Sequence, residues 1–233
     1  MKHNGRYWYL SLGFEALNTE KIELTGESIG VDLGIKDLAI VSNIDKPFKN
    51  INKSNKVKKL NKRLIRFQRQ VSRKYDKLKS EKAFKKGEKL NKTNNIIRLE
   101  KKIKLLHKKI SDIRLNHMHQ TTNAIVKTKP SRVVVEDLNV KELLKNKHLS
   151  KAIAEQSFNK FMNALEYKCE WYGIEFVKAD RFYPSSKKCS CCNTIKKDLK
   201  LKDRTYVCPN EKCNLVIDRD KNASINLANY QLA

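Results

Sequence analysis

One strongly basic segment with a helical repeat constrains this chain more than any other feature. Residues 53–116 contain 24 lysines and arginines against 5 acidic residues. Apolar residues recur in this segment at alternating steps of three and four, in two runs: Val57, Leu60, Leu64, Phe67 and Val71, then Ile96, Leu99, Ile103, Leu106, Ile110 and Ile113. Such spacing places each run on one stripe of a helix. The sequence therefore predicts two long antiparallel helices, at about 54–78 and 94–127, packed along these stripes.

The charge of this segment indicates the kind of partner. It supplies +19 of a formal net charge of +26 on 233 residues, which is more than solubility requires. A polyanion, and nucleic acid in particular, is the expected partner. The candidate phosphate-binding side chains lie on the first helix: Lys58, Lys59, Lys62, Arg63, Arg66, Arg69, Arg73 and Lys74. The alternative is a solvated coiled-coil face, but few acids are present to form i,i+4 pairs.

The rest of the chain has an alternating strand and helix pattern. We expect strands at 7–12, 21–24, 28–34, 38–42, 132–137 and 174–177, and helices at 150–172 and 219–231. Gly173 is expected to end the first of these helices. This order predicts an α/β fold. No apolar run reaches the ~18 residues of a membrane span, and no signal peptide opens the chain, so we expect an intracellular protein without a membrane partner.

Acidic residues occur in two of the expected strands, Asp32 within its strand and Glu136 near the end of its strand. Asp32 has apolar neighbours, and Glu136 follows three valines. Buried carboxylates are costly unless they bind a cation, and a further acidic pair, Asp218 and Asp220, precedes the last helix. Acids from three elements could converge on two Mg²⁺ ions ~4 Å apart, which activate water and stabilise the leaving oxygen in phosphodiester hydrolysis. Alternatively each acid is a cap or a surface residue, and Asp220 complements the N-terminal end of its helix.

Five of the six cysteines lie close together in the C-terminal part of the chain. The spacing of four of them, two residues between the first pair and four between the second, is typical of a tetrahedral zinc site: Cys189, Cys192, Cys208 and Cys213. Four thiolates leave no open coordination position, so the Zn²⁺ is expected to be structural. Disulfides are the alternative, which the intracellular composition disfavours. Cys191 is a spare cysteine between the first two ligands.

These motifs together resemble a known family. Gly30–Gly34, Val135–Asn139 and Asp218–Asn226 are similar to the three RuvC motifs of the TnpB (OrfB) proteins of bacterial insertion sequences, relatives of the compact type V CRISPR effectors. Residues 166–173 and 183–192 are similar to the helix before the family's zinc ribbon and to the start of that ribbon. The resemblance covers about residues 25–230.

The resemblance implies a RuvC-like nuclease of the RNase H fold, with a mixed α/β sheet, a long basic helical-hairpin insertion and an inserted zinc ribbon. Asp32, Glu136 and Asp220 would hold Mg²⁺, with Asp218 as the alternative to Asp220. The implied partners are DNA and a guide RNA from the end of the element. The implied location is the cytoplasm of a bacterial or archaeal cell, in association with the nucleoid.

The resemblance also implies a division of the chain. The expected domains are remnant strands of a wedge-like domain at 1–28, a nuclease domain at 29–185 and 214–233 that carries the basic insertion at 53–127, and a zinc ribbon at 186–213. Family members have a longer N-terminal half, so we expect an N-terminally truncated member.

Three hypotheses for the function remain at this point. The first is a Mg²⁺-dependent DNA endonuclease of the TnpB type, or an inactive fragment of one. The second is a zinc-ribbon module that binds nucleic acid without cutting it. The third, a DNA-strand transferase, is weaker, because the chain lacks an evident Tyr or Ser recombinase constellation.

Overall fold

The structure is a computed structural model that describes residues 1–3, 7–13, 22–81, 91–200 and 202–231. The chain forms two compact units. One contains residues 1–17 and 51–117, and the other contains residues 18–50 and 118–233. None of the helices within the described ranges is both long and apolar enough to cross a bilayer.

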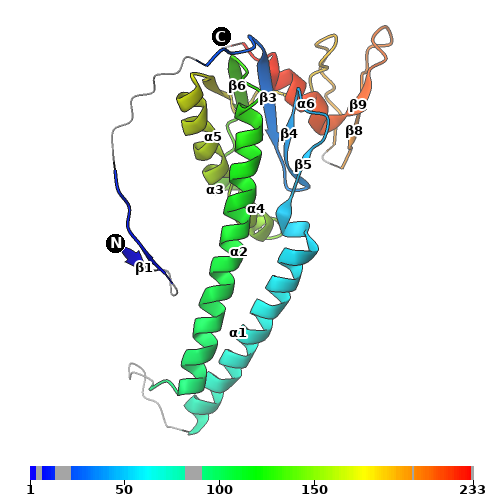
Figure 1. Cartoon of the computed structure of the whole chain (residues 1–233). Coiled ribbons are helices and arrows are strands. Elements are labelled where there is room, and N and C mark those ends of the chain that lie inside the picture. The colour runs from blue at the N-terminus through cyan, green and yellow to red at the C-terminus, as the bar shows by residue number, and fades with distance from the viewer. Residues whose placement is uncertain (4–6, 14–21, 82–90, 201, 232–233) are drawn as a thin grey trace. The chain divides into compact units, whose positions relative to one another are not determined.

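The first unit is built on the two basic helices, which the sequence predicted (Figure 1). The 3-10 turn Ile51–Lys53 leads into α1 (Asn55–Glu81), and α2 spans Asn94–Val126. The expected stripes meet in one cluster, whose buried members are Val57, Leu64, Leu106 and Ile110. The helices run antiparallel, because Arg114 Nε donates to Asn52 (2.6 Å) at one end and the Tyr75 hydroxyl to Glu100 (2.6 Å) at the other.

The expected N-terminal strands are only partly present. Within 7–12, only Trp8–Tyr9 (β2) is a strand, and it pairs antiparallel with Lys2–His3 (β1). The prediction of a strand at 21–24 is wrong for residues 22–24, which are not in a strand. Residue 21 lies outside the described residues. An alternation of only four residues is a weak signal for a strand.

The second unit contains a five-stranded mixed sheet in the order β5-β4-β3-β6-β7. Its strands are β3 (Ser28–Leu33), β4 (Asp37–Val41), β5 (Phe48–Lys49), β6 (Arg132–Glu136) and β7 (Glu175–Ala179). β3 pairs antiparallel with β4 and parallel with β6, and β6 pairs parallel with β7. β3 and β4 thus form a hairpin, and the predicted α/β class is confirmed.

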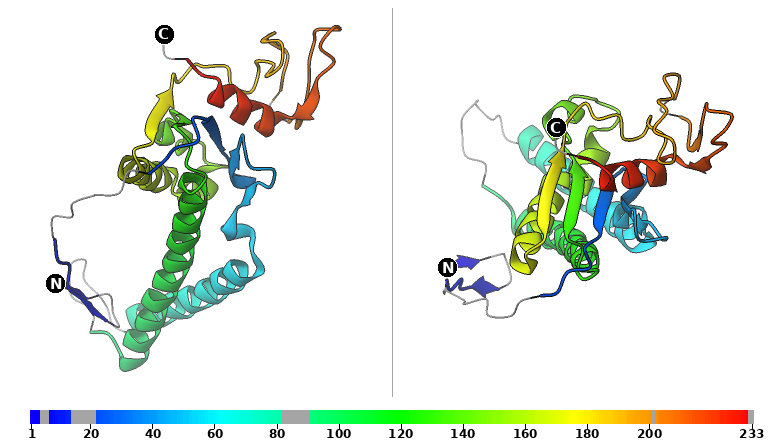
Figure 2. Two further views of the ribbon diagram at one scale, coloured as in Figure 1. Left: turned by 45° about the horizontal axis from the view of Figure 1, so that its top comes forward. Right: turned by 90° about the horizontal axis from the view of Figure 1, so that it is seen from above.

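The two faces of this sheet are covered by different helices, as the two-residue period of a strand requires. One face buries Ile29, Val31, Val133 and Val135 in the main core, which also contains α5 (Phe158–Tyr172) and the last turns of α2. The other face packs against α6 (Arg219–Ala228), and Figure 2 shows α6 next to β3. This second face carries the even-numbered residues of β3 and β6.

The helix expected at 150–172 is broken into two. α4 (Ser150–Gln156) and α5 are separated by Ser157, which takes a left-handed conformation with φ of 55°. Gly173 ends α5 with φ of 69°, as predicted. A short helix, α3 (Val140–Leu143), follows β6, and α6 ends at Ala228 rather than at residue 231.

Along the chain, the cysteine-rich segment lies between β7 and α6. It contains a small antiparallel hairpin of β8 (Thr205–Val207) and β9 (Val216–Asp218). Because β9 spans Val216–Asp218, this hairpin extends beyond residue 213, where we expected the zinc ribbon to end. β9 continues directly into α6. The direct connection fixes the hairpin next to the acidic residues at the start of α6.

Candidate functional site

Asp32 and Glu136 lie at the same level of adjacent parallel strands. Val31 of β3 pairs with Val135 of β6, and each acid is the next residue of its strand. Both therefore belong to the even-numbered set, whose face is covered by α6. Two segments about a hundred positions apart in the sequence are in this way brought to one point.

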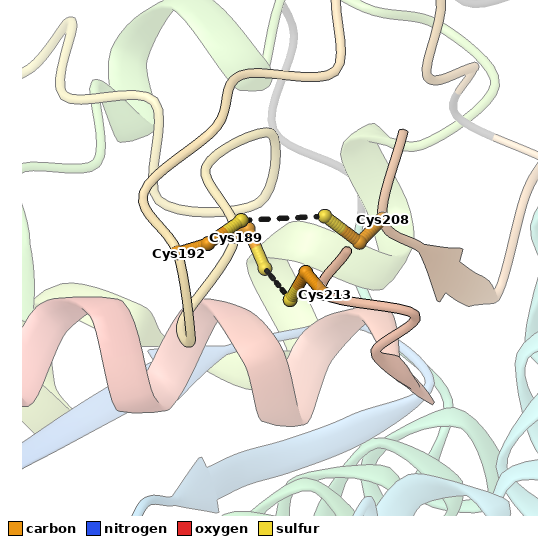
Figure 3. A group of neighbouring side chains, drawn as sticks. All are labelled: Cys189, Cys192, Cys208 and Cys213. Atoms are coloured by element: carbon orange, nitrogen blue, oxygen red, sulfur yellow. Dashed lines mark hydrogen bonds between the residues drawn. The ribbon is translucent and has the colours of Figure 1, made fainter. Parts of the chain in front are cut away.

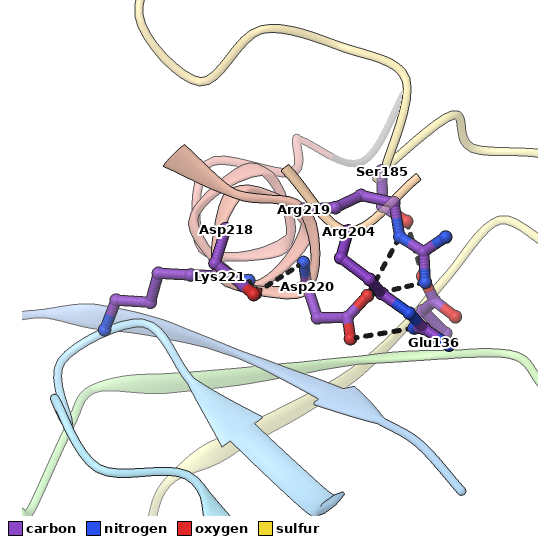
Figure 4. A network of polar contacts seen from close by, with 7 residues as sticks. All are labelled: Glu136, Ser185, Arg204, Asp218, Arg219, Asp220 and Lys221. Atoms are coloured by element: carbon purple, nitrogen blue, oxygen red, sulfur yellow. Dashed lines mark hydrogen bonds and ion pairs between the residues drawn. The ribbon is translucent and has the colours of Figure 1, made fainter. Parts of the chain in front are cut away.

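Asp220 reaches the same face from the first turn of α6. Asp218 is the N-cap of this helix: its Oδ1 accepts hydrogen bonds from the amides of Asp220 (3.0 Å) and Lys221 (3.1 Å). The Asp218 carboxylate thus satisfies backbone donors of the helix, as N-cap acids do. The Asp220 carboxylate has no such role and lies on the side of Glu136 in Figure 4.

The three acids influence one another electrostatically. Burial raises the pKa of Asp32 well above its usual range, and the charges of Glu136 and Asp220 raise it further. Burial also raises the pKa of Glu136, against a hydrogen bond from Ser185 that lowers it. Crowded, desolvated carboxylates favour a proton or a cation. Within the described residues their oxygens do not all gather within 4.8 Å, in contrast to the cysteine sulfurs below.

Two arginines compensate the Asp220 charge. Arg219 donates to Asp220 Oδ1 through Nε (2.9 Å) and Nη2 (2.8 Å), and Arg204 lies 3.6 Å from Oδ2 (Figure 4). Arg204 immediately precedes β8, so the cysteine-rich segment contributes to the acidic site. Neither arginine was predicted from the sequence, in which the position of Arg219 between two acids is the one signal.

Ser185 is a second contact that the sequence analysis missed. Its buried side chain donates a short hydrogen bond to Glu136 Oε1, and its carbonyl accepts from Asn226 Nδ2 (2.7 Å). The hydroxyl fixes one carboxylate oxygen of Glu136 and leaves the other available. Nothing in the pattern of the chain distinguishes this serine from its neighbour Ser186.

The asparagines of α6 have a structural role. Asn222 and Asn226 stand one turn apart, and each donates from Nδ2 to the carbonyl of Lys188 (2.7 and 2.6 Å). Asn222 Oδ1 also accepts from the amide of Ser190 (3.0 Å). Both asparagines are buried, so their polar groups need these partners. They hold the segment before the first cysteines against the helix that carries Asp220.

The four predicted zinc ligands come together in what we call the cysteine cluster: Cys189, Cys192, Cys208 and Cys213. All four sulfurs lie within 4.8 Å of one another, and two pairs are 3.7 and 3.5 Å apart (Figure 3). A tetrahedral Zn²⁺ with Zn–S bonds of about 2.3 Å requires sulfurs about 3.8 Å apart. The donor set and its spacing fit such an ion.

The protonation of the cysteine cluster is uneven without a cation. The Thr194 hydroxyl, 3.2 Å away, lowers the pKa of Cys192 to about 6, whereas burial raises the pKa of Cys208 to about 12. Four adjacent thiolates repel one another, so a cation is needed to keep all of them ionised. Cys191 is exposed and is not a member of the cluster.

The eight basic residues predicted to bind nucleic acid are all exposed on α1. In the described part of the first unit, no ion pair joins any of them to an acid. Arg63 lies 5.4 Å from the centre of the Phe67 ring, which orients its guanidinium along the helix. This surface is a band of positive charge without internal compensation, as the composition led us to expect.

A mixed sheet that carries adjacent carboxylates under a covering helix defines an α/β protein with a candidate divalent-metal site. Comparisons with known proteins then give the family. The profile of the OrfB_IS605 family, described as "Probable transposase", matches residues 14–147, and that of the "Cas12f1-like, TNB domain" matches residues 158–227. The chain belongs to the OrfB_IS605 family, so the resemblance seen in the sequence is confirmed.

Similar proteins carry related names. The chain is 34% identical over 226 residues to a "Putative RNA-guided DNA endonuclease" of Streptomyces pristinaespiralis, covering 97% of this chain and 50% of that protein. It is 26% identical over 243 residues to InsQ of Escherichia coli K12, which has the same description, covering 97% and 53%. The chain thus spans about half the length of these relatives.

Solved structures share the fold. The cryo-EM structure of a Cas12f1–sgRNA–target DNA complex matches with a TM-score of 0.58 at 20% identity, covering 91% of this chain and 52% of that one. A second, a CRISPR-Cas12f ternary complex, matches with a TM-score of 0.57 at 22% identity, covering 96% and 42%.

Proposed function

We propose that this chain is the catalytic part of an RNA-guided DNA endonuclease and hydrolyses DNA phosphodiesters at Asp32, Glu136 and Asp220. The observation that carries the proposal is the pairing of Val31 with Val135, which brings Asp32 and Glu136 level beneath the first turn of α6. Relatives named for that activity support it.

The three carboxylates would hold two Mg²⁺ ions, which supply an activated water and charge stabilisation of the leaving oxygen. The residues of the chain have distinct tasks around this chemistry. Asp32 and Glu136 offer oxygens from rigid strands, and Ser185 orients Glu136. We prefer Asp220 to Asp218 as the third ligand, because the Asp218 carboxylate caps α6. Arg219 and Arg204 neutralise Asp220 until a cation binds.

The cysteine cluster would hold one structural Zn²⁺ ion. Its sulfur spacing fits four thiolates, and a complete set of four leaves no position for substrate. Because β9 continues into α6, this ion would stabilise the position of Arg204 and the start of the helix that carries Asp220. We propose the division of the chain expected from the sequence, with the nuclease domain at 29–185 and 214–233, the basic insertion at 53–127 and the zinc ribbon at 186–213. The second strand of the ribbon hairpin, β9, would then belong to the start of the last nuclease segment.

DNA and a guide RNA would be the partners, and the basic surface of α1 would contact their phosphates. All eight of its candidate residues are exposed, which supports this assignment. Such a protein would act in the cytoplasm of a bacterial or archaeal cell, at the nucleoid. Residues 1–28, which include β1 and β2, would belong to a wedge-like domain.

The experiment that tests this proposal has two stages. The chain is expressed with its native flanking DNA, and the RNA that copurifies is sequenced. The complex is then incubated with DNA that matches this RNA, with Mg²⁺ or with EDTA. Cleavage that requires Mg²⁺ and is lost in Asp32→Asn, with unchanged DNA binding, is expected. Equal cleavage by Asp32→Asn would refute the assignment of the site.

One observation favours a second candidate, a nucleic-acid-binding module that does not cut. Asp220 is paired with two arginines, so the acidic site is already partly neutralised by the chain itself. If these pairs persist in Mg²⁺, the complex will bind DNA and leave it intact. In that case, calorimetry will show the same Mg²⁺ binding for the wild type and for Asp220→Asn.

A further inference from the structure

A cavity of about 330 Å³ opens beside Glu136 and Ser185. Its lining comes from the ends of β6 and β7 and from α3, and includes Asp137, Asn139, Asp180, Arg181 and Tyr183. The segment that follows β7 contributes Asp180, Arg181 and Tyr183 to this lining. Phe182 lies between Arg181 and Tyr183 in the chain and does not itself line the cavity.

The residues on both sides of Phe182 are fixed to the body of the unit. The amide of Asp180 donates to the Tyr230 hydroxyl (3.2 Å), and Arg181 forms an ion pair with Asp137 (2.5 Å). The Tyr183 ring packs edge-on against Tyr230, with centroids 4.9 Å apart. A loop anchored by a backbone hydrogen bond, an ion pair and a ring contact has little freedom to rearrange.

Phe182 is therefore held outward. Its amide donates to Asp180 Oδ1 (2.7 Å), which closes a tight turn, and its side chain is 88% exposed. Trp171, the other strongly exposed aromatic residue of this unit among those described, is 61% exposed and contacts Tyr167 edge-on, with ring centroids 4.7 Å apart. An exposed phenyl ring on an anchored turn, at the edge of a cavity that Glu136 lines, is a preformed platform for a flat apolar ligand.

The lining of the cavity limits what that ligand can be. Glu136, Asp137, Glu142 and Asp180 contribute four carboxylates against the single guanidinium of Arg181. A phosphate would be repelled there, whereas the uncharged face of a nucleobase would not. Its amino groups would also find acceptors among these carboxylates. In a duplex both faces of a base are covered by its neighbours, so only a single strand can offer one.

We propose that Phe182 stacks on a base of the single-stranded DNA whose neighbouring phosphodiester reaches the three acids. This inference rests on the proposed function, because it takes the acids as the point of cleavage. Phe182 is in this view a substrate-positioning residue: it fixes the register of the strand by stacking, which does not depend on sequence. The basic surface of α1 supplies the electrostatic part of the affinity.

Binding to a labelled oligothymidine of about twelve nucleotides, measured by fluorescence anisotropy in EDTA, tests the proposal. Base stacking on an aromatic ring contributes enough that Phe182→Ala is expected to weaken binding on the order of tenfold. Phe182→Trp should restore it. The loss should be the same at low and high salt, because stacking releases no counterions. Trp171→Ala is the matched control and should bind as the wild type does.

Photocrosslinking locates the contact. A strand that carries 5-iodouracil should crosslink to the peptide that contains Phe182, and the crosslink should disappear in Phe182→Ala. Wild-type affinity in Phe182→Ala, or crosslinks only to other peptides, would overturn the inference. Because these assays contain no divalent cation, they are independent of cleavage. An inactive wild type that still needs Phe182 for binding would contradict the proposed function and leave the stacking contact standing.

Discussion

Gly30 of β3 and Ser224 of α6 are in contact backbone to backbone. A Cβ on Gly30 would overlap the carbonyl oxygen of Ser224 and lie 2.5 Å from the amide nitrogen of Ala228. No side chain fits between the helix and the strand here. This close approach brings the first turn of α6, with Asp220, over the strand that carries Asp32.

Gly30→Ala should therefore destabilise the second unit. The obstructing atoms are backbone, which cannot move aside as a flexible side chain would, so a loss of about 1–3 kcal/mol in the free energy of unfolding is expected. Urea denaturation measures it. Gly13→Ala is the control, because no atom lies within 4 Å of the position of its Cβ. Equal stability of the two variants would mean that α6 does not pack on β3 as described.

Asp218 and Asp220 should separate into a capping role and a chemical role. Asp220→Asn is expected to abolish Mg²⁺-dependent cleavage and to leave DNA binding intact. Asp218→Asn should remain active, because Asn is also a good N-cap, whereas Asp218→Ala should cost about 1 kcal/mol of stability. Cleavage assays and thermal unfolding of the three variants give the answer. If Asp218→Asn is inactive but has normal stability, Asp218 and not Asp220 would be the third metal ligand.

Asp32 should make the metal-free protein less stable as pH rises. Its pKa is raised in the folded state, so the folded chain binds this proton more tightly than the unfolded chain does. The resulting stability is complete below the ordinary Asp value of 3.8 and is lost as pH rises through the raised folded value. In EDTA, Asp32→Asn should thus be more stable than the wild type at neutral pH, and the difference should shrink on acidification.

Addition of Mg²⁺ should reverse that order. The cation compensates the carboxylates of the wild type, so its midpoint in urea should rise, while that of Asp32→Asn should change little. Denaturation curves at several pH values, with and without Mg²⁺, provide the comparison. A variant that is less stable than the wild type in EDTA at every pH would show that the Asp32 charge is already compensated within the chain.

Removal of one cysteine of the cluster should release the metal. Cys208→Ser is expected to lose one bound Zn²⁺ per chain and to unfold the β8–β9 hairpin, because metal binding and local folding are coupled. Metal analysis of the purified chain measures the first effect. Cys191→Ser is the matched control, since Cys191 is exposed and outside the cluster, and it should keep its zinc. Full zinc content in Cys208→Ser would exclude the four-thiolate site.

If the basic surface of α1 binds phosphates, the affinity for nucleic acid should fall as the salt concentration rises. Each phosphate contact that is removed lowers the slope of log affinity against log salt by about 1. Lys62→Gln should lower the slope by this amount, and Lys62→Arg should keep it, because only the first change removes charge. Titrations at several salt concentrations measure the slope. An unchanged slope in Lys62→Gln would place the phosphates elsewhere on the protein.

The sequence by itself determined the elements that depend on local pattern. The apolar repeat defined α1 and α2 to within a few residues, because a helical stripe is encoded at spacings of three and four. The valine run defined β6, and Gly173 defined the end of α5 through its left-handed conformation. The spacing of the cysteines was sufficient to name all four members of the cluster, since two short-range pairs need only one further approach to complete it.

Tertiary structure alone decided which polar groups meet across long separations. The register of β3 on β6 sets Asp32 level with Glu136, and the close approach at Gly30 brings α6 over that face. Ser185 contacts Glu136, and Arg204 contacts Asp220. The local sequence of these segments does not predict either contact. Local spacing encodes a repeat or a cap, whereas these contacts depend on how separate elements pack, which no short stretch of the chain specifies.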